Sequence, residues 1–240
     1  MKLLLSIQNL EQLNCDADEF VLGYERHCSF ASHYFLHEEI IEASKNHKIW
    51  VLMNALINED ELDLAISHIK ELMEYGVGFI VQDIGLLSFL VKHYDLEKII
   101  FNPYTLICNS EDLKAYQALG VTVFVSNVAT DKERLLGDKT ALEVFGYLPI
   151  YQSYRKVLSL YEKGHDITLP SHDLYLKENT REDLYHTIEN DYGTVVFNHM
   201  VNDEIDEKYI NAEYWFIDSF YLSDQEIESV LERARKLCKR

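Results

Sequence analysis

The chain has 240 residues, of which 48% are hydrophobic, with three prolines, nine glycines and a formal net charge of −19. This composition supplies a full hydrophobic core and excludes an intrinsically disordered protein. The acidity argues against direct binding of nucleic acid, because such a surface repels phosphate backbones.

We expect a cytoplasmic protein that does not associate with membranes. The apolar run after Met1 is too short for a signal peptide, and no segment approaches the length of a transmembrane helix. The cysteines are scattered and no pair has CxxC spacing: Cys15, Cys28, Cys108 and Cys238. That scatter predicts neither a disulfide framework nor a metal site built from neighbouring residues.

Apolar, β-rich runs recur roughly every 20–30 residues, and helical periodicity fills most of the intervals, as in βα repeats. Eight runs are predicted strands: Leu3–Ile7, Glu19–Leu22, Ile49–Met53, Gly78–Val81, Lys98–Phe101, Val121–Val125, Leu142–Phe145 and Tyr214–Ile217. Helices are predicted at Leu36–Lys45, Glu59–Tyr75, Leu86–His93, Ser110–Leu119, Asp131–Leu136 and Ser223–Lys239. The last of these opens with a capping box and ends in basic residues.

Eight βα units predict an α/β protein with a (β/α)8, TIM-barrel-like fold, in a single domain spanning residues 1–240. Residues 169–200 break the alternation between the seventh and eighth strands. They contain strand-like runs at Asp173–Lys177 and Thr194–Asn198, so we expect a small β-rich insertion packed on the barrel. An open, doubly wound sheet is the alternative, but the even spacing and the length favour closure.

In a barrel of this kind, the chemistry collects where the strands end. Carboxylates there can serve as general bases or metal ligands, and the candidates are Asp83, Glu25 and Asp218. The candidates for ligand binding are the polar residues Gln82, Asn54, Asn102, Asn127, Tyr147 and Arg155. The same residue types also begin turns, so each position has a purely structural explanation as well.

Three histidines follow the second predicted strand together with Cys28, namely His27, His33 and His37. On a helix, His33 and His37 would share one face, as two zinc ligands do. The glutamate of an HExxH motif is missing, so surface histidines are the favoured interpretation and we expect no metal.

Tyrosines concentrate in and around the insertion: Tyr151, Tyr154, Tyr161, Tyr175, Tyr185 and Tyr192. Tyrosine can bury its ring while its hydroxyl group meets a polar partner. The cluster therefore predicts either a docking or stacking surface or an aromatic core of the insertion, and the core is favoured.

Five segments, in order along the chain, carry a resemblance to a known family. Residues 76–87 end a strand in Gln-Asp and continue Ile-Gly-Leu-Leu, and residues 102–121 lead through Asn-Ser into a helix that ends in Leu-Gly-Val. The others are Leu142–Pro149, Gly193–Asn198 and Ala212–Lys236. With these segments the chain resembles peptidase family U32 over nearly its whole length, which implies a barrel-like α/β fold.

The family name implies proteolysis, whereas other members are iron–sulfur proteins needed for hydroxylating tRNA or rRNA bases or for oxygen-independent ubiquinone synthesis. Cluster-bearing members place two cysteines after the seventh strand, in the frame Gly-x-Leu-Cys-x-x-x-Ser-x-Arg-Cys. Here that frame runs from Gly146, with Pro149 and Lys156 in the cysteine positions. Iron–sulfur ligation needs four thiolates, so we expect no cluster and no cofactor. The basic residues of the family's last strand are also missing from residues 216–220.

Three functions stay open, and the sequence names no substrate. The favoured one is a non-catalytic partner or ligand-binding subunit that works beside a second, cysteine-containing U32 protein. The first alternative is a peptidase or other hydrolase that uses the strand-end carboxylates. The second is an accessory role in tRNA or rRNA hydroxylation.

Overall fold

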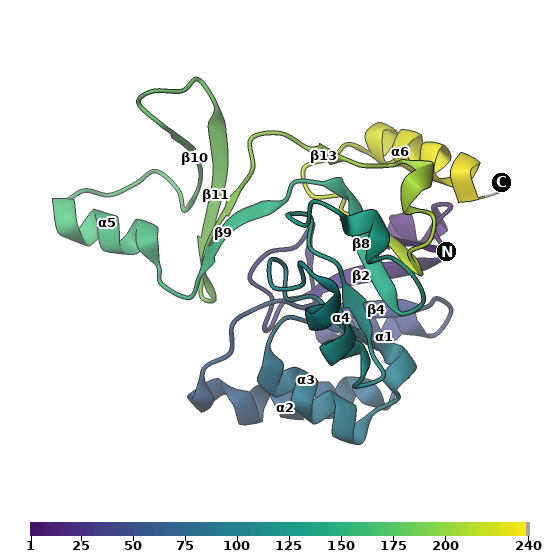
Figure 1. Cartoon of the computed structure of the whole chain (residues 1–240). Helices are drawn as coiled ribbons and strands as arrows, with labels where there is room; N and C mark the ends of the chain where they lie inside the picture. The colour runs from purple at the N-terminus through teal and green to yellow at the C-terminus, as the bar shows by residue number, and fades with distance from the viewer. Residues whose placement is uncertain (239–240) are drawn as a thin grey trace.

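The computed structural model describes residues 1–238, and within them eight parallel strands form a closed barrel (Figure 1). The strands are β1 (Lys2–Ser6), β2 (Glu19–Tyr24), β4 (Ile49–Met53), β5 (Gly78–Val81), β6 (Ile99–Phe101), β7 (Thr122–Phe124), β8 (Thr140–Gly146) and β14 (Tyr214–Ile217). β1 pairs with both β14 and β2, which closes the ring. The predicted (β/α)8 fold is therefore confirmed, and the open sheet is excluded.

Helices follow most of the strands and pack against the outside of the barrel. They are α1 (His37–Ser44), α2 (Glu59–Met73), α3 (Ile84–His93), α4 (Ser110–Gln117) and α6 (Asp224–Cys238). Single 3-10 turns and short strands complete the connections: η1 (Leu10–Asn14), β3 (Tyr34–Phe35), η2 (Leu96–Lys98), η3 (Lys132–Arg134), β13 (Asn202–Asp203) and η4 (Glu207–Tyr209). None of the helices in residues 1–238 is both long enough and apolar enough for a membrane span.

One predicted helix does not form, and another extends past the described residues. The helix expected at 131–136 is wrong, because only the turn η3 forms there. Lys132 in that turn is buried and pairs with Glu204, and Gly137 follows at once, so the segment is held as a connection rather than as a helix. The last residue of the final predicted helix, Lys239, lies outside the described residues.

Side chains alternate between the inside of the barrel and the layer that faces the helices. In β1, Leu4 points inward, whereas Leu3 and Leu5 pack in the outer layer with the helices. The interior is filled with large side chains, including Trp50 and Phe124. The barrel is therefore a packed core, and a binding site has to lie at one of its ends.

A second, antiparallel sheet projects from the barrel, and with its helix we call it the arm (residues 149–197; Figure 1). The strands lie in the order β10 (Asp173–Lys177), β11 (Leu184–Asn190), β12 (Gly193–Phe197) and β9 (Pro149–Ser153), and α5 (Val157–His165) follows β9. The expected β-rich insertion between barrel strands seven and eight is confirmed. Its sheet extends beyond residues 169–200, because β9 comes only two residues after β8.

The arm is fixed to the barrel by an apolar contact and a polar one. Val195 and Phe197 of β12 pack against Phe30 and Phe220, which lie after β2 and β14. Gln152 of β9 donates hydrogen bonds to Ser29 and Asn54 at the carboxyl end of the barrel. One side of the arm therefore covers the carboxyl end of the barrel.

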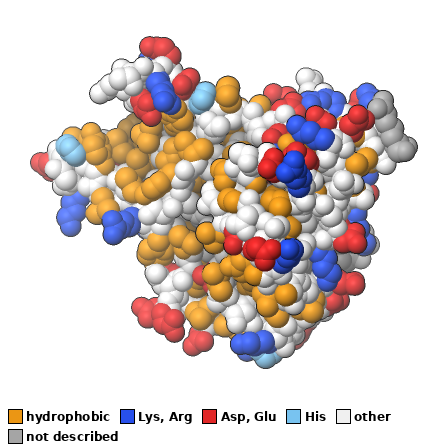
Figure 2. All heavy atoms as spheres, viewed as in Figure 1, with side chains coloured by type: hydrophobic (Ala, Val, Ile, Leu, Met, Phe, Trp, Pro, Cys, Tyr) orange, Lys and Arg blue, Asp and Glu red, His pale blue; other side chains and the backbone are white. Residues whose placement is uncertain are grey.

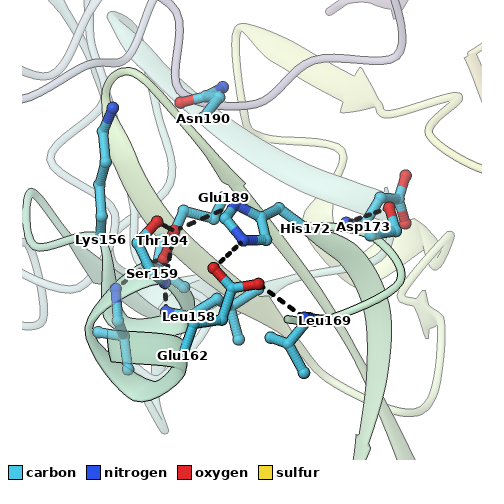
Figure 3. A network of polar contacts seen from close by, with 12 residues as sticks. Lys156, Leu158, Ser159, Glu162, Leu169, His172, Asp173, Glu189, Asn190 and Thr194 are labelled. Carbon is cyan, nitrogen blue, oxygen red and sulfur yellow. Dashed lines mark hydrogen bonds and ion pairs between the residues drawn. The ribbon is translucent and has the colours of Figure 1, made fainter. Parts of the chain in front are cut away.

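Within the arm, Glu189 of β11 fastens α5 to the sheet (Figure 3). Its carboxylate accepts hydrogen bonds from the backbone N–H groups of Leu158 (2.6 Å) and Ser159 (3.0 Å) and from Thr194 Oγ1 (2.6 Å). The Nδ1 atom of His172 lies 3.4 Å from Glu189 Oε1. A carboxylate at the first turn of a helix satisfies orphan N–H groups and complements the helix dipole.

The surface of the arm is apolar in part, and Figure 2 shows hydrophobic side chains gathered on it. Several of its tyrosines are exposed, Tyr151 by 45%, Tyr161 by 49% and Tyr175 by 60%. They do not form the aromatic core that we expected for the insertion, because Val195, Phe197 and their barrel contacts fill that role. The exposed rings leave the docking or stacking interpretation open.

Candidate functional site

The carboxyl ends of the barrel strands meet at one mouth, beneath the arm. Asn54, Gln82 and Asn102 follow β4, β5 and β6, Asn127 lies three residues after β7, and Asp218 follows β14. The structure thus brings five of the predicted residues to the same end of the barrel. Their contacts divide them into residues that hold loops and residues that face a cavity.

Asn54 holds a loop. Its Oδ1 accepts hydrogen bonds from the backbone N–H of Ser29 (2.8 Å) and from the thiol of Cys28 (3.3 Å). Its Nδ2 donates to the carbonyl oxygen of Phe30 (2.9 Å) and to the hydroxyl of Tyr104 (3.1 Å). With its amide used in full and its side chain buried, Asn54 positions the mouth and has no capacity left for a ligand.

Gln82 connects the barrel to the arm. Its Nε2 donates to Oε1 of Gln152 (2.9 Å), and Gln152 Nε2 donates to Ser29 Oγ and to the carbonyl oxygen of Asn54, both at 2.9 Å. Asp83, its neighbour, caps α3 by accepting a hydrogen bond from the N–H of Leu86 (2.9 Å). This contact gives Asp83 a structural role as a helix cap, whereas Gln82 Oε1 is buried without a hydrogen-bond partner among the described residues.

Glu25 and Tyr147 also follow barrel strands, β2 and β8, but they make other contacts, and Arg155 belongs to the arm. Glu25 is partly exposed and faces Arg26, with 3.5 Å between Oε1 and Nε. Tyr147 packs against the apolar contact between arm and barrel. Arg155 lies on the arm, in a groove shared with Lys156 and Lys163.

Asp218 is buried at the end of β14 and is surrounded by donors. Its Oδ1 accepts hydrogen bonds from Ser6 Oγ (2.6 Å), Ser32 Oγ (2.9 Å) and the backbone N–H of Phe220 (3.2 Å). Burial raises its pKa, and these hydrogen bonds act in the opposite direction. Asp218 therefore anchors the loop after β2 to the last barrel strand.

Glu143 on β8 is a buried carboxyl that the sequence did not single out. Its Oε1 has no hydrogen-bond partner among the described residues. Burial raises its pKa well above the ordinary value, and the negative charge of Asp218 adds to the effect. The only signal in the sequence is one charged residue inside the apolar strand between Leu142 and Val144.

Glu143 lines a cavity of about 320 Å³ at the mouth. Asn102 and Asn127 provide further polar groups, and Asn127 Oδ1 is likewise buried without a partner among residues 1–238. Six apolar residues form most of the remaining wall: Phe124, Val125, Val128, Leu148, Pro149 and Ile150. Tyr104, Thr105, Ser126 and Asn198 complete the lining. A cavity with apolar walls and a few convergent polar groups is the usual form of a small-molecule site.

A smaller cavity lies deeper in the barrel, between Glu143, Asn102 and Asp218. Its volume of about 10 Å³ is close to the least that can hold one water molecule. The two cavities share Asn102 and Glu143 in their linings, whereas Asp218 lines the deeper cavity and not the mouth cavity.

The histidines do not assemble a metal site. His37 is the first residue of α1 and bonds the Tyr24 hydroxyl at 3.0 Å, whereas His33 precedes β3, so the two do not share a helix face. His27 Nε2 lies 3.0 Å from Nδ1 of His68, and burial lowers the pKa of His27 to about 4. In residues 1–238, no group of three or more His, Cys, Asp or Glu residues could hold a metal ion.

The thiols do not fit an iron–sulfur cluster either. Cys28 is buried, and burial raises its pKa to about 12, which keeps the thiol protonated. Pro149 begins β9 and Lys156 precedes α5, so the two positions at which the resemblance implies cysteines carry no thiol. The cysteines of the described residues form no group of three or more ligands that could hold a metal centre.

Comparison with protein families gives a match to the model of peptidase family U32 over residues 9–170. The curated proteins and the solved structures give no significant match. The matched region covers barrel strands two to seven and most of the residues that line the mouth cavity. The chain belongs to peptidase family U32.

Proposed function

We propose that this chain is a non-redox, ligand-binding member of its family, which holds a small molecule in the mouth cavity. The observation that supports the proposal most is the carboxyl of Glu143, which is buried, lacks a partner at Oε1 and lines that cavity. Leaving a buried polar group without a hydrogen bond costs about 1–3 kcal/mol. A bound ligand that supplies the missing partner would remove this cost.

The ligand is expected to be uncharged. No Lys or Arg residue lines the cavity within the described part of the chain, so an anion would find no counter-ion. Burial favours the uncharged form of Glu143, which can donate one hydrogen bond to a carbonyl oxygen. Asn127 Oδ1 is the matching acceptor for an N–H group. An amide carried by a compact apolar group satisfies all these contacts.

Three probes with one carbon skeleton test this proposal: benzamide, benzoate and benzylamine. Ligand-observed NMR at pH 7 should show binding of benzamide and at least tenfold weaker binding of the two charged compounds. Glu143→Gln keeps a hydrogen-bond donor and should keep benzamide binding, whereas Glu143→Leu should lose it. Glu25→Leu is the control outside the cavity. Equal binding of all three probes would contradict an uncharged-ligand site.

The buried carboxyl of Glu143 favours a second candidate function, hydrolysis with Glu143 as the general acid. Burial raises its pKa and so favours the protonated form that a general acid needs. In this version Glu143 is the acid that faces the cavity, and Asp83 has a structural role as a helix cap. A fluorogenic peptide library would show turnover that Glu143→Gln abolishes and Asp83→Asn retains. Turnover unaffected by Glu143→Gln would exclude this version.

We further propose that a cysteine-containing U32 protein is the partner of this chain in the cytoplasm. Pro149 and Lys156 in the cysteine positions support this, because the redox chemistry of the family would have to come from another subunit. An accessory role in RNA hydroxylation would act through that partner, since the chain carries a net charge of −19. A tagged copy should recover an iron-containing family member from cell extract, and recovery of none would contradict the pairing.

A further inference from the structure

The arm sheet has two edges, and only one of them is protected. β9 forms one edge, where Pro149, a bulge opposite Phe197 and the contacts of Gln152 block further pairing. β10 forms the other edge, and its strand contains neither proline nor bulge. An unprotected edge strand is a template on which another strand can pair.

The register shows which backbone groups β10 offers. The N–H of Glu189 donates to the carbonyl of His172 at 2.8 Å, so these two residues form a hydrogen-bonded pair of the ladder. Because such pairs alternate, Leu174 and Leu176 also bond to β11. The backbone groups that point away from the sheet belong to the residues between them, Asp173, Tyr175 and Lys177.

One of these outward groups already has a partner, because the N–H of Asp173 donates to Ser171 Oγ at 2.9 Å. The others are the carbonyl of Asp173 and both backbone groups of Tyr175 and of Lys177. Tyr175 and Leu176 are 60% and 42% exposed, and no strand within residues 1–238 pairs with this edge.

The sequence of β10 is self-complementary in the antiparallel direction. It reads Asp173-Leu174-Tyr175-Leu176-Lys177, with a negative charge at one end, a positive charge at the other and leucines on both sides of the central tyrosine. If a second copy pairs with Tyr175 opposite Tyr175, each Asp173 lies opposite a Lys177 and each Leu174 opposite a Leu176. Opposite charges and apolar pairs directly across from each other stabilise a sheet.

We propose that two copies of this chain associate through antiparallel β10–β10 pairing about a two-fold axis at Tyr175. The central pair forms two hydrogen bonds between tyrosine backbones. The N–H of each Lys177 donates to the carbonyl of the other copy's Asp173, which adds two more without disturbing Ser171. The two four-stranded sheets become one sheet of eight strands.

The dimer should be weak. Five residues per copy form a contact below the usual size of a stable interface. The net charge of −19 on each chain also opposes association, although salt at physiological strength screens charges more than about 8 Å apart. We expect a dissociation constant in the micromolar range, so the fraction of dimer should depend on protein concentration.

Sedimentation velocity from 1 to 200 µM measures the association. The average mass of the wild-type chain should rise from 28.1 kDa towards twice that value as the concentration increases. Hydrogen exchange at residues 173–177 should slow over the same range. A constant mass of one chain at 200 µM would overturn the proposal and would leave the edge to a strand of another protein.

Charge reversal tests the register itself. In Asp173→Lys and in Lys177→Asp, like charges face each other, so each variant alone should stay monomeric at concentrations where the wild type dimerises. An equimolar mixture restores opposite charges at both pairs and should regain the mass of a dimer. Asp173 also bonds His186, so circular dichroism must first show that Asp173→Lys is folded.

Lys163→Asp on α5 makes the same charge change as Lys177→Asp but lies outside the edge. This control variant should dimerise as the wild type does. Dimerisation of both single variants, or a mixture that stays monomeric, would overturn the assigned pairing. Neither outcome would bear on the mouth cavity, because β10 contributes no residue to it.

Discussion

Glu143 and Asp218 meet at Gly146. A Cβ atom on that glycine would lie 3.0 Å from Glu143 Oε1 and 2.7 Å from Asp218 Cβ. The approach of the two side chains explains why the charge of Asp218 adds to burial in raising the pKa of Glu143. The glycine therefore decides how close the carboxyls come at the mouth of the barrel.

Gly146→Ala is expected to destabilise the fold by about 3 kcal/mol. The backbone φ of Gly146 is +144°, a conformation that L-residues rarely adopt, and the added methyl group meets Asp218. Urea unfolding measures the change. Gly137→Ala is the matched control, because no atom lies within 4 Å of its added Cβ, and it should change stability by less than about 0.5 kcal/mol. Equal effects of the two substitutions would contradict the packing at Gly146.

Glu143→Gln should change how stability depends on pH. The pKa of Glu143 is raised in the folded state, so above about pH 4.3 this carboxyl is still protonated in the folded chain but ionised in the unfolded chain. The free energy of unfolding of the wild type therefore falls as the pH rises. The fall continues up to the folded pKa. Glu143→Gln lacks this loss. Its free energy of unfolding relative to the wild type should therefore increase by about 1 kcal/mol or more between pH 4 and pH 7.

Urea unfolding at several pH values measures this difference. Glu232→Gln on the exposed face of α6 is the control and should keep a constant difference from the wild type over the same range. A constant difference for Glu143→Gln as well would show that the buried carboxyl ionises normally.

The barrel strands were predictable because strands buried on both faces are continuous apolar runs. Ile49–Met53, Gly78–Val81 and Tyr214–Ile217 have the expected ends. β9 was missed because Pro149–Ser153 follows β8 after two residues and has exposed side chains, so its sequence lacks a strand-like alternation. Its partner β12 lies more than 40 residues later, and such a pairing leaves no local signal.

The site was predictable only in part, for the same reason. The ends of predicted strands locate Asn102 and Asp218 at the mouth. Glu143 lies within a strand, where one charged residue among apolar ones does not show which way it points. Its Oε1 is buried beside Gly146, and the cavity that Glu143 lines is closed partly by Pro149 and Ile150 of the arm. These contacts arise only in the folded chain.

Gln82 and Gln152 should be coupled in stability. The hydrogen bond between them joins barrel and arm, so a double-mutant cycle of Gln82→Ala and Gln152→Ala should give a coupling energy of about 1 kcal/mol. Urea unfolding of the two single variants and the double variant measures it. Gln152 has further bonds to Ser29 and Asn54, so its single substitution should cost more than that of Gln82. Additive effects would show that the contact does not hold the arm.

Glu189→Gln should release α5 from the arm. The carboxylate accepts hydrogen bonds from Leu158, Ser159 and Thr194 (Figure 3). In glutamine an NH2 group replaces one of the two oxygens, and it cannot accept a hydrogen bond from these groups. Burial opposes the charge, but these hydrogen bonds prevail and lower the pKa of Glu189. We expect a loss of about 2 kcal/mol at pH 7, seen as faster hydrogen exchange at residues 157–165.

The sign of the pH dependence is opposite to that of Glu143. The pKa of Glu189 is lowered in the folded state. The contribution of its charge to stability is therefore complete above the unfolded pKa of about 4.3 and is lost as the pH falls through the folded pKa. The difference between wild type and Glu189→Gln should therefore shrink on acidification. Glu178→Gln, at an exposed pair with Arg181, is the control and should leave α5 protected at every pH. Unchanged exchange of α5 in Glu189→Gln at pH 7 would show that apolar packing alone holds the helix.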